Sequence, residues 1–262
     1  MYYEHGLGET TIVLCHPVTA GLAVFQPLLE RLCQDFRIVM CAPRGTGKSD
    51  PLPGPYYTAD FAEDLRAVVE SASDRPVVEV GHSRGATVGT HFTTSYPHLV
   101  DKLVLAGLAP AGPSWVADHP EADLVDRAFA GRLAAALATD DWAEVTRVFM
   151  TQVSAGETGT RKLVDGAGAA WSQVPLPSLR NFFALDDPGR DVRALLPKIR
   201  VPTLVLHGEV DRVSPLEMAR RTVERIPGAQ FQVLAGRSLA MLATPTAEFA
   251  ELVRRFVRTG EV

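Results

Sequence analysis

Cysteine is scarce in this sequence, and the spacing of its cysteines argues against two classes of protein. The 262 residues include only three, Cys15, Cys33 and Cys41. An odd number is not typical of a disulfide framework, and the absence of a C-x-x-C pair argues against a zinc site. We therefore expect three core residues, no metal site and no cofactor.

An excess of positive charge is also missing. The chain has 26 lysines and arginines against 31 acidic residues, a net charge of −5, and no long basic run. Nucleic acid and anionic membranes are therefore poor candidate partners. The sequence has no run of about 18 apolar residues and no basic start followed by an apolar stretch, so we expect neither a membrane span nor an export signal. These absences predict a cytoplasmic protein and leave its oligomeric state open.

Short β-branched runs alternate with segments of helical period along most of the chain. Most of the runs are apolar throughout, which is typical of strands covered by helices on both faces. This alternation predicts an α/β fold, a doubly wound and mostly parallel sheet. The predicted strands cover residues 11–15, 37–41, 77–80, 103–106, 203–206 and 231–234.

One long stretch breaks this alternation, because residues 110–196 contain no convincing strand. Asp141 followed by Glu144 predicts a capped helix there. We interpret 110–196 as a helical cap inserted into a core of 1–109 and 197–262, above the carboxyl ends of the strands where such folds bind ligands. Three aromatic side chains are candidates for lining a substrate pocket under this cap, although core packing is the commoner role: Trp171, Phe182 and Phe183.

A serine lies at the apex of a predicted strand-to-helix turn. The segment Gly81-His82-Ser83-Arg84-Gly85 directly follows the apolar run 77–80. G-x-S-x-G is the nucleophile elbow, in which flanking glycines allow a cramped turn that exposes the serine hydroxyl above the sheet. We therefore predict that Ser83 is the nucleophile.

Three further motifs make nearly the whole chain resemble the α/β-hydrolase superfamily. His16-Pro17 stands where the family usually has His-Gly, residues 42–50 are similar to its R-G-x-G-x-S-D turn, and residues 207–211 match its H-G-x-x-D acid loop. The capped esterases, enol-lactonases and cofactor-free haloperoxidases look nearest. The resemblance implies that Asp211 is the triad acid and that the backbone N–H groups of Val18 and Arg84 form the oxyanion hole.

The sequence departs from the family where the catalytic histidine is expected. Arg237 occupies that position, between Gly236 upstream and the terminal helix downstream. No histidine follows His207, so a shift in the alignment supplies none. Arginine stays protonated and has no acceptor lone pair, so it does not activate a serine hydroxyl.

This altered site favours chemistry other than ester hydrolysis. We expect Arg237 to pair with Asp211 and to hold a substrate carboxylate or a developing enolate or alkoxide. The predicted function is a non-hydrolytic step, such as a cyclisation, an elimination (lyase reaction) or an addition. The substrate is a small metabolite with a carbonyl or carboxylate group, and analogy with altered relatives suggests a biosynthetic pathway.

Several alternatives remain open. His119, in the predicted cap, is the candidate for a displaced base in a serine esterase or lactonase, whereas His16, His82 and His207 are expected to serve packing. A pocket that binds a ligand without chemistry is a third possibility. Residues 42–49 differ from the phosphate-binding G-x-x-x-x-G-K-[ST] loop only at their first position, and a nucleoside triphosphatase is the weakest alternative.

Overall fold

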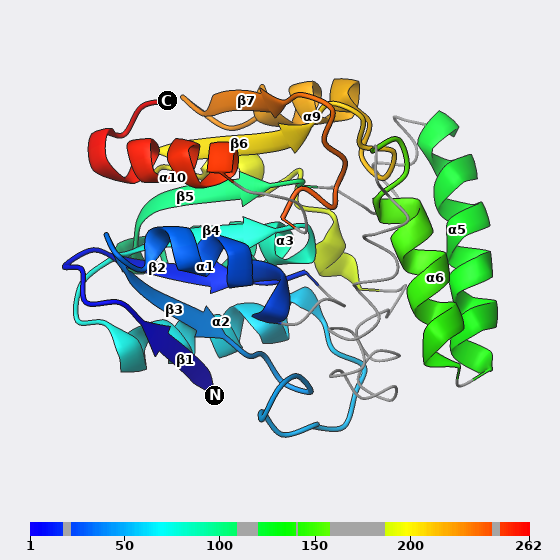
Figure 1. Ribbon diagram of the computed structural model, residues 1–262, viewed down its shortest axis with the longest axis horizontal. Helices are drawn as coiled ribbons and strands as arrows, with labels where there is room; N and C mark the ends of the chain where they lie inside the picture. The colour runs from blue at the N-terminus through cyan, green and yellow to red at the C-terminus, as the bar shows by residue number, and fades with distance from the viewer. Residues whose placement is uncertain (18–21, 109–119, 140, 158–186, 243–246) are drawn as a thin grey trace.

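The computed structural model of the protein is built around a single twisted β-sheet (Figure 1). The structure describes residues 1–17, 22–108, 120–139, 141–157, 187–242 and 247–262. The sheet has seven strands in the order β1-β3-β2-β4-β5-β6-β7. The strands β2 to β7 run parallel to one another, and β1 runs antiparallel to β3 at one edge. The strands are β1 (Tyr2–His5), β2 (Thr11–Cys15), β3 (Arg37–Cys41), β4 (Val77–His82), β5 (Val100–Ala106), β6 (Thr203–Gly208) and β7 (Gln230–Leu234).

The predicted fold class and all six predicted strands are confirmed. The apolar runs form β2 to β7, and most residues of β2 to β6 are buried because helices cover both faces of the sheet. The strand β7, at the edge, is mostly half-buried. The strand β1 was not predicted. Its residues are half-buried or exposed on an edge, so they carry no continuous apolar signal.

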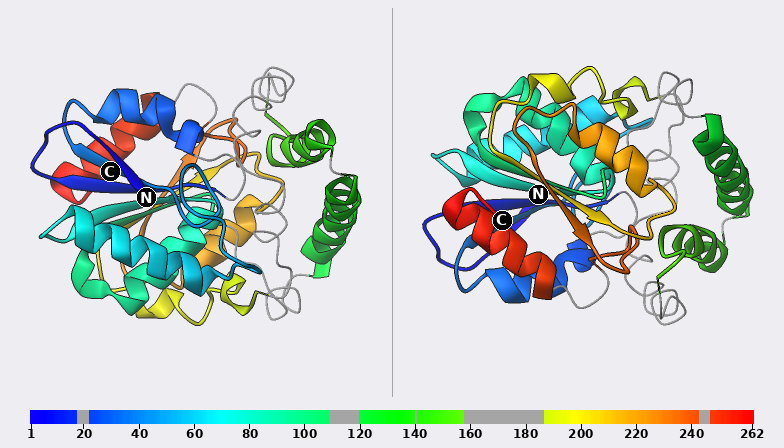
Figure 2. Two further views of the ribbon diagram at one scale, coloured as in Figure 1. Left: turned by 90° about the horizontal axis from the view of Figure 1, so that it is seen from below. Right: turned by 90° about the horizontal axis from the view of Figure 1, so that it is seen from above.

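Helices form a layer on each side of the sheet (Figure 2). One face carries α1 and α10, and the other carries α2, α3 and α9. Among the described residues, no helix is long and apolar enough to cross a membrane. The core helices are α1 (Gln26–Leu32), α2 (Thr58–Ala72), α3 (Arg84–Ser95), α9 (Leu216–Val223) and α10 (Ala247–Thr259), with short 3₁₀ turns at η1 (Leu22–Phe25), η2 (Pro97–Leu99), η3 (Pro188–Arg190) and η4 (Leu196–Lys198).

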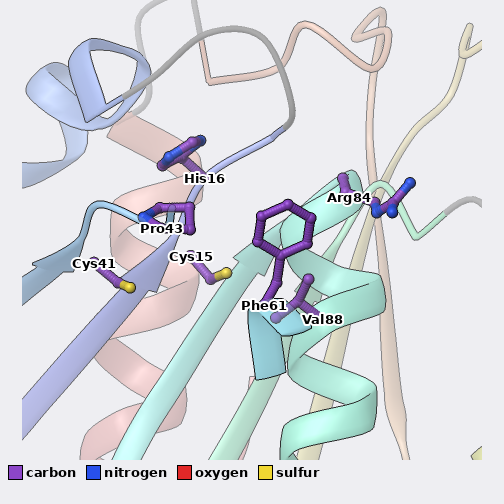
Figure 3. Close-up of a pocket in the computed structure, with 7 residues that line it drawn as sticks. All are labelled: Cys15, His16, Cys41, Pro43, Phe61, Arg84 and Val88. Carbon is purple, nitrogen blue, oxygen red and sulfur yellow. The ribbon is translucent and has the colours of Figure 1, made fainter. Parts of the chain in front are cut away.

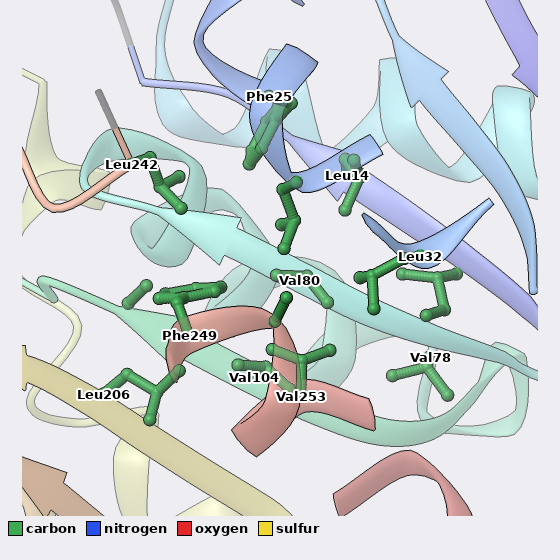
Figure 4. Packing of buried hydrophobic residues seen from close by; sticks show 14 of the residues in the cluster. Leu14, Phe25, Leu32, Val78, Val80, Val104, Leu206, Leu242, Phe249 and Val253 are labelled. Carbon is green, nitrogen blue, oxygen red and sulfur yellow. The ribbon is translucent and has the colours of Figure 1, made fainter. Parts of the chain in front are cut away.

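The core on the α1 and α10 side holds the elbow strand in place. Val78 and Val80 of β4 point into it, between Leu14 of β2 and Val104 of β5 (Figure 4). Phe249 of α10 closes the same cluster from above the sheet. Each of these side chains is almost completely buried, so the strand that leads to Ser83 is fixed by packing along its length.

Two further helices, α5 (Pro120–Ala138) and α6 (Trp142–Val153), lie beyond the carboxyl ends of the strands (Figure 1). Asp141 caps α6 as expected, accepting hydrogen bonds from the backbone N–H groups of Ala143 and Glu144. The Glu144 carboxylate pairs with Arg147. The division of the chain into a core and a cap at residues 110–196 stays a prediction.

Glu79 is an acidic residue buried in the middle of β4, on the side of α3. It is fully buried, and neither carboxylate oxygen has a hydrogen-bond partner among the described residues. The carboxylate fits because residue 89 of α3 is glycine: a Cβ atom there would lie 2.3 Å from Oε2. Burial raises the pKa of Glu79 well above its ordinary value, so the side chain is protonated in the folded protein at mildly acidic pH.

We predict that Glu79→Met stabilises the protein and that the gain grows with pH. Because the pKa of Glu79 is raised by folding, its destabilising effect is absent below the unfolded-state pKa and increases as the pH rises toward the folded-state value. The expected gain is about 1–3 kcal/mol in the free energy of unfolding at pH 8, measured in urea. Equal stabilities of the two proteins at pH 5 and pH 8 would contradict this.

Candidate active site

The segment 81–85 forms a nucleophile elbow between β4 and α3. Ser83 has φ 54° and ψ −117°, and it is the one described non-glycine residue with a positive φ. Both flanking glycines are required by close backbone approach. A Cβ at Gly81 would lie 2.5 Å from the carbonyl oxygen of Gly85, and a Cβ at Gly85 would lie 2.0 Å from the carbonyl oxygen of Cys15. The predicted turn is therefore present, with Ser83 at its apex.

Arg84 begins α3 directly after the serine. As the first residue of the helix, it has a backbone N–H without an acceptor inside the helix. This N–H is placed as the family's oxyanion donor requires. The second expected donor, Val18, lies outside the described residues.

Asp211 lies in the loop that follows β6, as the acid motif predicts. Its Oδ1 atom accepts hydrogen bonds from the backbone N–H groups of Val213 and Ser214, at 2.8 and 3.0 Å. Its Oδ2 atom is buried and has no hydrogen-bond partner among the described residues. Burial raises the pKa of Asp211 to about 7, against the lowering effect of the two backbone donors.

The loop that carries Arg237 lies against the acid loop. The carbonyl oxygen of Arg237 accepts a hydrogen bond from the N–H of Val210 at 2.9 Å, and the N–H of Gly236 donates to the Glu209 carboxylate at 2.8 Å. Gly208 must lack a side chain here, because a Cβ would lie 2.4 Å from the Arg237 carbonyl oxygen. The acid and the arginine therefore occupy neighbouring loops.

The expected pairing of Arg237 with Asp211 is wrong. The Nη1 atom of Arg237 lies 3.3 Å from Oε1 of Glu157, and 32% of the Arg237 side chain is exposed. Oδ2 of Asp211 accepts no hydrogen bond from it. The observed partner, Glu157, is 80 residues away in the chain and offers the arginine a negative charge.

Glu157 is the functional-site residue that sequence reasoning missed. Its side chain is only 2% exposed. Oε2 accepts hydrogen bonds from the N–H and the hydroxyl of Ser238, at 3.1 and 2.6 Å. The preceding Gly156, at φ 93°, packs on Val210 of the acid loop. No local pattern marks this glutamate, because its partners come from the far end of the sequence.

An apolar cluster extends the same contact between α6 and the core. Met150 and Val153, near the end of α6, pack against Leu239, two residues after Arg237. The Leu239 carbonyl oxygen also bonds Nε2 of His82, at 2.8 Å. The end of α6 is thus fixed to the loop at the predicted base position by both apolar and charged contacts.

The three histidines nearest the motifs serve packing. Nδ1 of His16 and Nε2 of His82 and His207 each lie within 2.8 Å of a backbone carbonyl oxygen. Burial lowers the pKa of all three, that of His82 to about 4. His207 is therefore neutral, and its Nε2 atom, 3.8 Å from Oδ2 of Asp211, donates to Ser214 instead. None of the three hydrogen-bonds Ser83.

Residues 42–49, which resemble a phosphate-binding loop, form hydrogen bonds with one another. The Ser49 hydroxyl donates to the Ala42 carbonyl at 2.6 Å, and the Thr46 N–H donates to the Pro43 carbonyl. Arg44 donates three hydrogen bonds to Asp64, one from its backbone N–H and two from its side chain. The next helix along the chain, α2, begins only at Thr58, so this turn does not lead directly into a helix N-terminus as a phosphate-binding loop does.

A cavity of about 20 Å³ lies behind the elbow (Figure 3). It has room for one water molecule, so it is too small to hold a substrate. Burial raises the pKa of the Cys41 thiol to about 12 and that of Cys15 well above its ordinary value, so neither is a nucleophile at neutral pH. The cavity is lined by Cys15, His16, Cys41, Pro43, Phe61, Arg84 and Val88.

Four predicted pocket residues lie outside the part of the chain that the structure describes: His119, Trp171, Phe182 and Phe183. Their roles stay predictions.

The chain belongs to the alpha/beta hydrolase fold family, whose sequence profile matches residues 10–237. It is 26% identical to a pimeloyl-[acyl-carrier protein] methyl ester esterase of Vibrio vulnificus, over 94% of this chain and 93% of that protein. Its fold matches a bromoperoxidase from Bacillus anthracis (TM-score 0.83, 24% identity, 98% and 94% of the two chains). It also matches an enol-lactonase from Burkholderia xenovorans (TM-score 0.83, 18% identity, 98% and 96%).

We predict that Glu157→Gln destabilises the protein far more than Glu144→Gln does. Glu157 is buried and accepts from Ser238 and Arg237, whereas Glu144 forms an exposed ion pair with Arg147 on α6. The expected losses in the free energy of unfolding are about 1.5–3 kcal/mol for the buried carboxylate and below about 0.5 kcal/mol for the exposed one. Equal losses in urea denaturation would show that the Glu157 contacts contribute little.

Asp211 should make the protein less stable as the pH rises. Folding raises its pKa to about 7, so its stabilising contribution is complete below about pH 4 and is lost as the pH rises through 7. Within this range we expect Asp211→Asn to remove up to about 1.4 kcal/mol per pH unit from the slope of unfolding free energy against pH. Parallel curves for the two proteins between pH 4 and 7 would refute the assignment.

Proposed function

We propose that the protein is an α/β-hydrolase-fold enzyme that catalyses a non-hydrolytic step on a small carbonyl compound. A cyclisation, an elimination or an addition fits this site better than formation of an acyl-enzyme. One observation carries the proposal: the residue at the base position is an arginine that pairs with Glu157, and none of the described histidines near the elbow hydrogen-bonds the Ser83 hydroxyl. Ser83 is therefore left without a described proton acceptor.

The remaining parts of the site suit carbonyl polarisation. The N-terminus of α3 and the N–H of Arg84 present partial positive charge beside Ser83. The Ser83 hydroxyl keeps its proton and donates to a developing oxygen anion. Arg237 lies on the neighbouring loop, where Glu157 balances its charge. Such a site stabilises an enolate or alkoxide without requiring a strong base.

Asp211 differs in its role from the acid of an intact triad. An intact triad uses this carboxylate to orient histidine and to stabilise the imidazolium. Here its pKa of about 7 leaves the group partly protonated at neutral pH. We propose that it keeps the site close to electrically neutral, which favours a substrate that is an anion or becomes one during the reaction.

The cysteines are relevant to the cellular compartment of the reaction. Cys15, Cys33 and Cys41 are free thiols, which suits a reducing compartment. We propose a cytoplasmic enzyme of a biosynthetic pathway whose substrate carries a carbonyl or carboxylate group.

Hydrolysis is the second candidate, because a relative is an esterase and a structural neighbour is an enol-lactonase. It requires a base that the described residues do not supply, and His119 is the proposed source. If Ser83-dependent hydrolysis is found, His119→Ala should abolish it.

Methyl levulinate, which carries both a ketone and an ester, tests the two functions in one sample. We predict that in D₂O the protein speeds the exchange of the protons beside the ketone, because the site stabilises the enolate that forms when solvent water takes up a proton and later returns a deuteron. Ser83→Ala should slow this exchange, and methanol release should stay near background. Losing the histidine of a triad costs on the order of a millionfold in turnover. Proton NMR measures both reactions.

The opposite outcomes are equally informative. Rapid methanol release that disappears in Ser83→Ala would establish a serine hydrolase and overturn the non-hydrolytic proposal. Saturable binding of the probe with neither reaction would favour a pocket that only binds ligands.

A further inference from the structure

Beside Ser83, a buried ion pair joins two distant parts of the chain. Nη2 of Arg84 lies 2.5 Å from Oδ2 of Asp187, and their side chains are only 12% and 1% exposed. Arg84 directly follows the nucleophile, whereas Asp187 is 103 residues further along the chain, just before η3. A charge pair this deeply buried is retained only where its hydrogen bonds are well satisfied.

The Asp187 carboxylate accepts hydrogen bonds from residues of three elements. Its Oδ2 atom accepts the N–H and the hydroxyl of Thr58, at 2.9 and 2.7 Å, in addition to Arg84. Its Oδ1 atom accepts the N–H of Gly189 at 2.9 Å. Thr58 is the first residue of α2, and Arg84 is the first residue of α3. One carboxylate therefore ties together the starts of two helices and the η3 turn.

The η3 turn is itself fixed to both helices. The Gly189 carbonyl oxygen accepts a hydrogen bond from Nε2 of His91 on α3, at 2.9 Å. A Cβ at position 189 would lie 2.8 Å from Cβ of Thr58, so the turn is pressed against α2. Asp187 is consequently an anchored partner for Arg84, held independently of it.

Arg84, in contrast, depends on Asp187. Among the described residues, Asp187 is the one hydrogen-bond acceptor of its side chain, and its buried Nε atom has none. The guanidinium lies 6.0 Å from the centre of the Phe61 ring, next to the elbow (Figure 3). Burial and the nearby Arg190 lower the pKa of Arg84 to about 10, which still leaves it protonated at neutral pH. The ion pair is thus charged and fixes the direction of the Arg84 side chain.

The Arg84–Asp187 ion pair lies next to the backbone of the Ser83 elbow. Ser83 holds an unfavourable conformation at φ 54°, which persists only when its surroundings enforce it. The N–H of Arg84, the next residue, is the group that would donate a hydrogen bond to a developing oxyanion. We infer that Asp187 is a positioning residue, which acts through the Arg84 side chain to hold this N–H and the Ser83 elbow in the reactive geometry. The inference rests on the proposed function, since it takes Ser83 as the reactive centre.

Phenylboronic acid tests this inference without knowledge of the substrate. Its boron accepts the Ser83 oxygen, the hydroxyl proton passes to solvent, and the resulting tetrahedral boron anion carries an oxygen into the oxyanion hole. Because the loss of a whole oxyanion donor costs about 10²–10³-fold, we expect its misplacement in Asp187→Asn to weaken the adduct about tenfold. Boron-11 NMR follows the tetrahedral species.

Asp191→Asn is the matched control. Asp191 lies in the same segment and pairs with Arg193, 3.1 Å away, rather than with the elbow. Its substitution should cost stability and leave the affinity for phenylboronic acid unchanged. Thr58→Val is a milder second variant, which removes the hydroxyl donor to Asp187 and should weaken the adduct about two- to threefold, because the Thr58 and Gly189 N–H groups still hold the carboxylate.

The possible failures are distinguishable. If the wild-type protein forms the adduct and Asp187→Asn binds as tightly as Asp191→Asn, the positioning role is overturned and the proposed function stands. If Asp187→Asn does not fold, unchanged binding by Thr58→Val overturns the role instead. If the wild-type protein forms no more adduct than Ser83→Ala, both the positioning role and the reactive site are overturned.

Discussion

The close approach of backbone at the elbow is the constraint on which the site depends. Gly85 at the start of α3 meets the carbonyl oxygen of Cys15 at the end of β2, in contact too close for any side chain. The same turn forces Ser83 to a positive φ. Because α3 packs this tightly on the sheet, its N-terminus and its unpaired N–H groups stand beside the serine hydroxyl. The position of these N–H groups beside Ser83 is therefore a consequence of backbone packing.

Three buried carboxylates around this turn have different surroundings. Glu157 and Asp187 each face an arginine and hydroxyl or backbone donors. Asp211 has only two backbone donors, and its pKa rises to about 7. Arg84 and Arg237 thus form ion pairs with Asp187 and Glu157. Asp211, the carboxylate that a triad would use, has no cationic partner among the described residues, and burial raises its pKa. Both arginines therefore pair with acids other than Asp211.

The family relationship explains the scaffold better than it explains the reaction. An esterase is related in sequence and an enol-lactonase has a similar fold, but function depends on the groups in the site. Here the elbow is intact while the loop at the base position is tied to the end of α6 through Glu157, Ser238 and Leu239. The described site therefore has the family's elbow and acid loop, with an arginine where the family's histidine is expected.

The sequence alone determined most of the sheet, the elbow and the order of Ser83, Asp211 and Arg237. These features are local: apolar runs define buried strands, and glycine spacing defines the turn. The half-exposed edge strand β1 gave no such signal. Only the tertiary structure decided the partners of the charged groups. Arg237 meets Glu157 and Arg84 meets Asp187 across 80 and 103 residues of chain, and a pairing between distant segments leaves no pattern in either one.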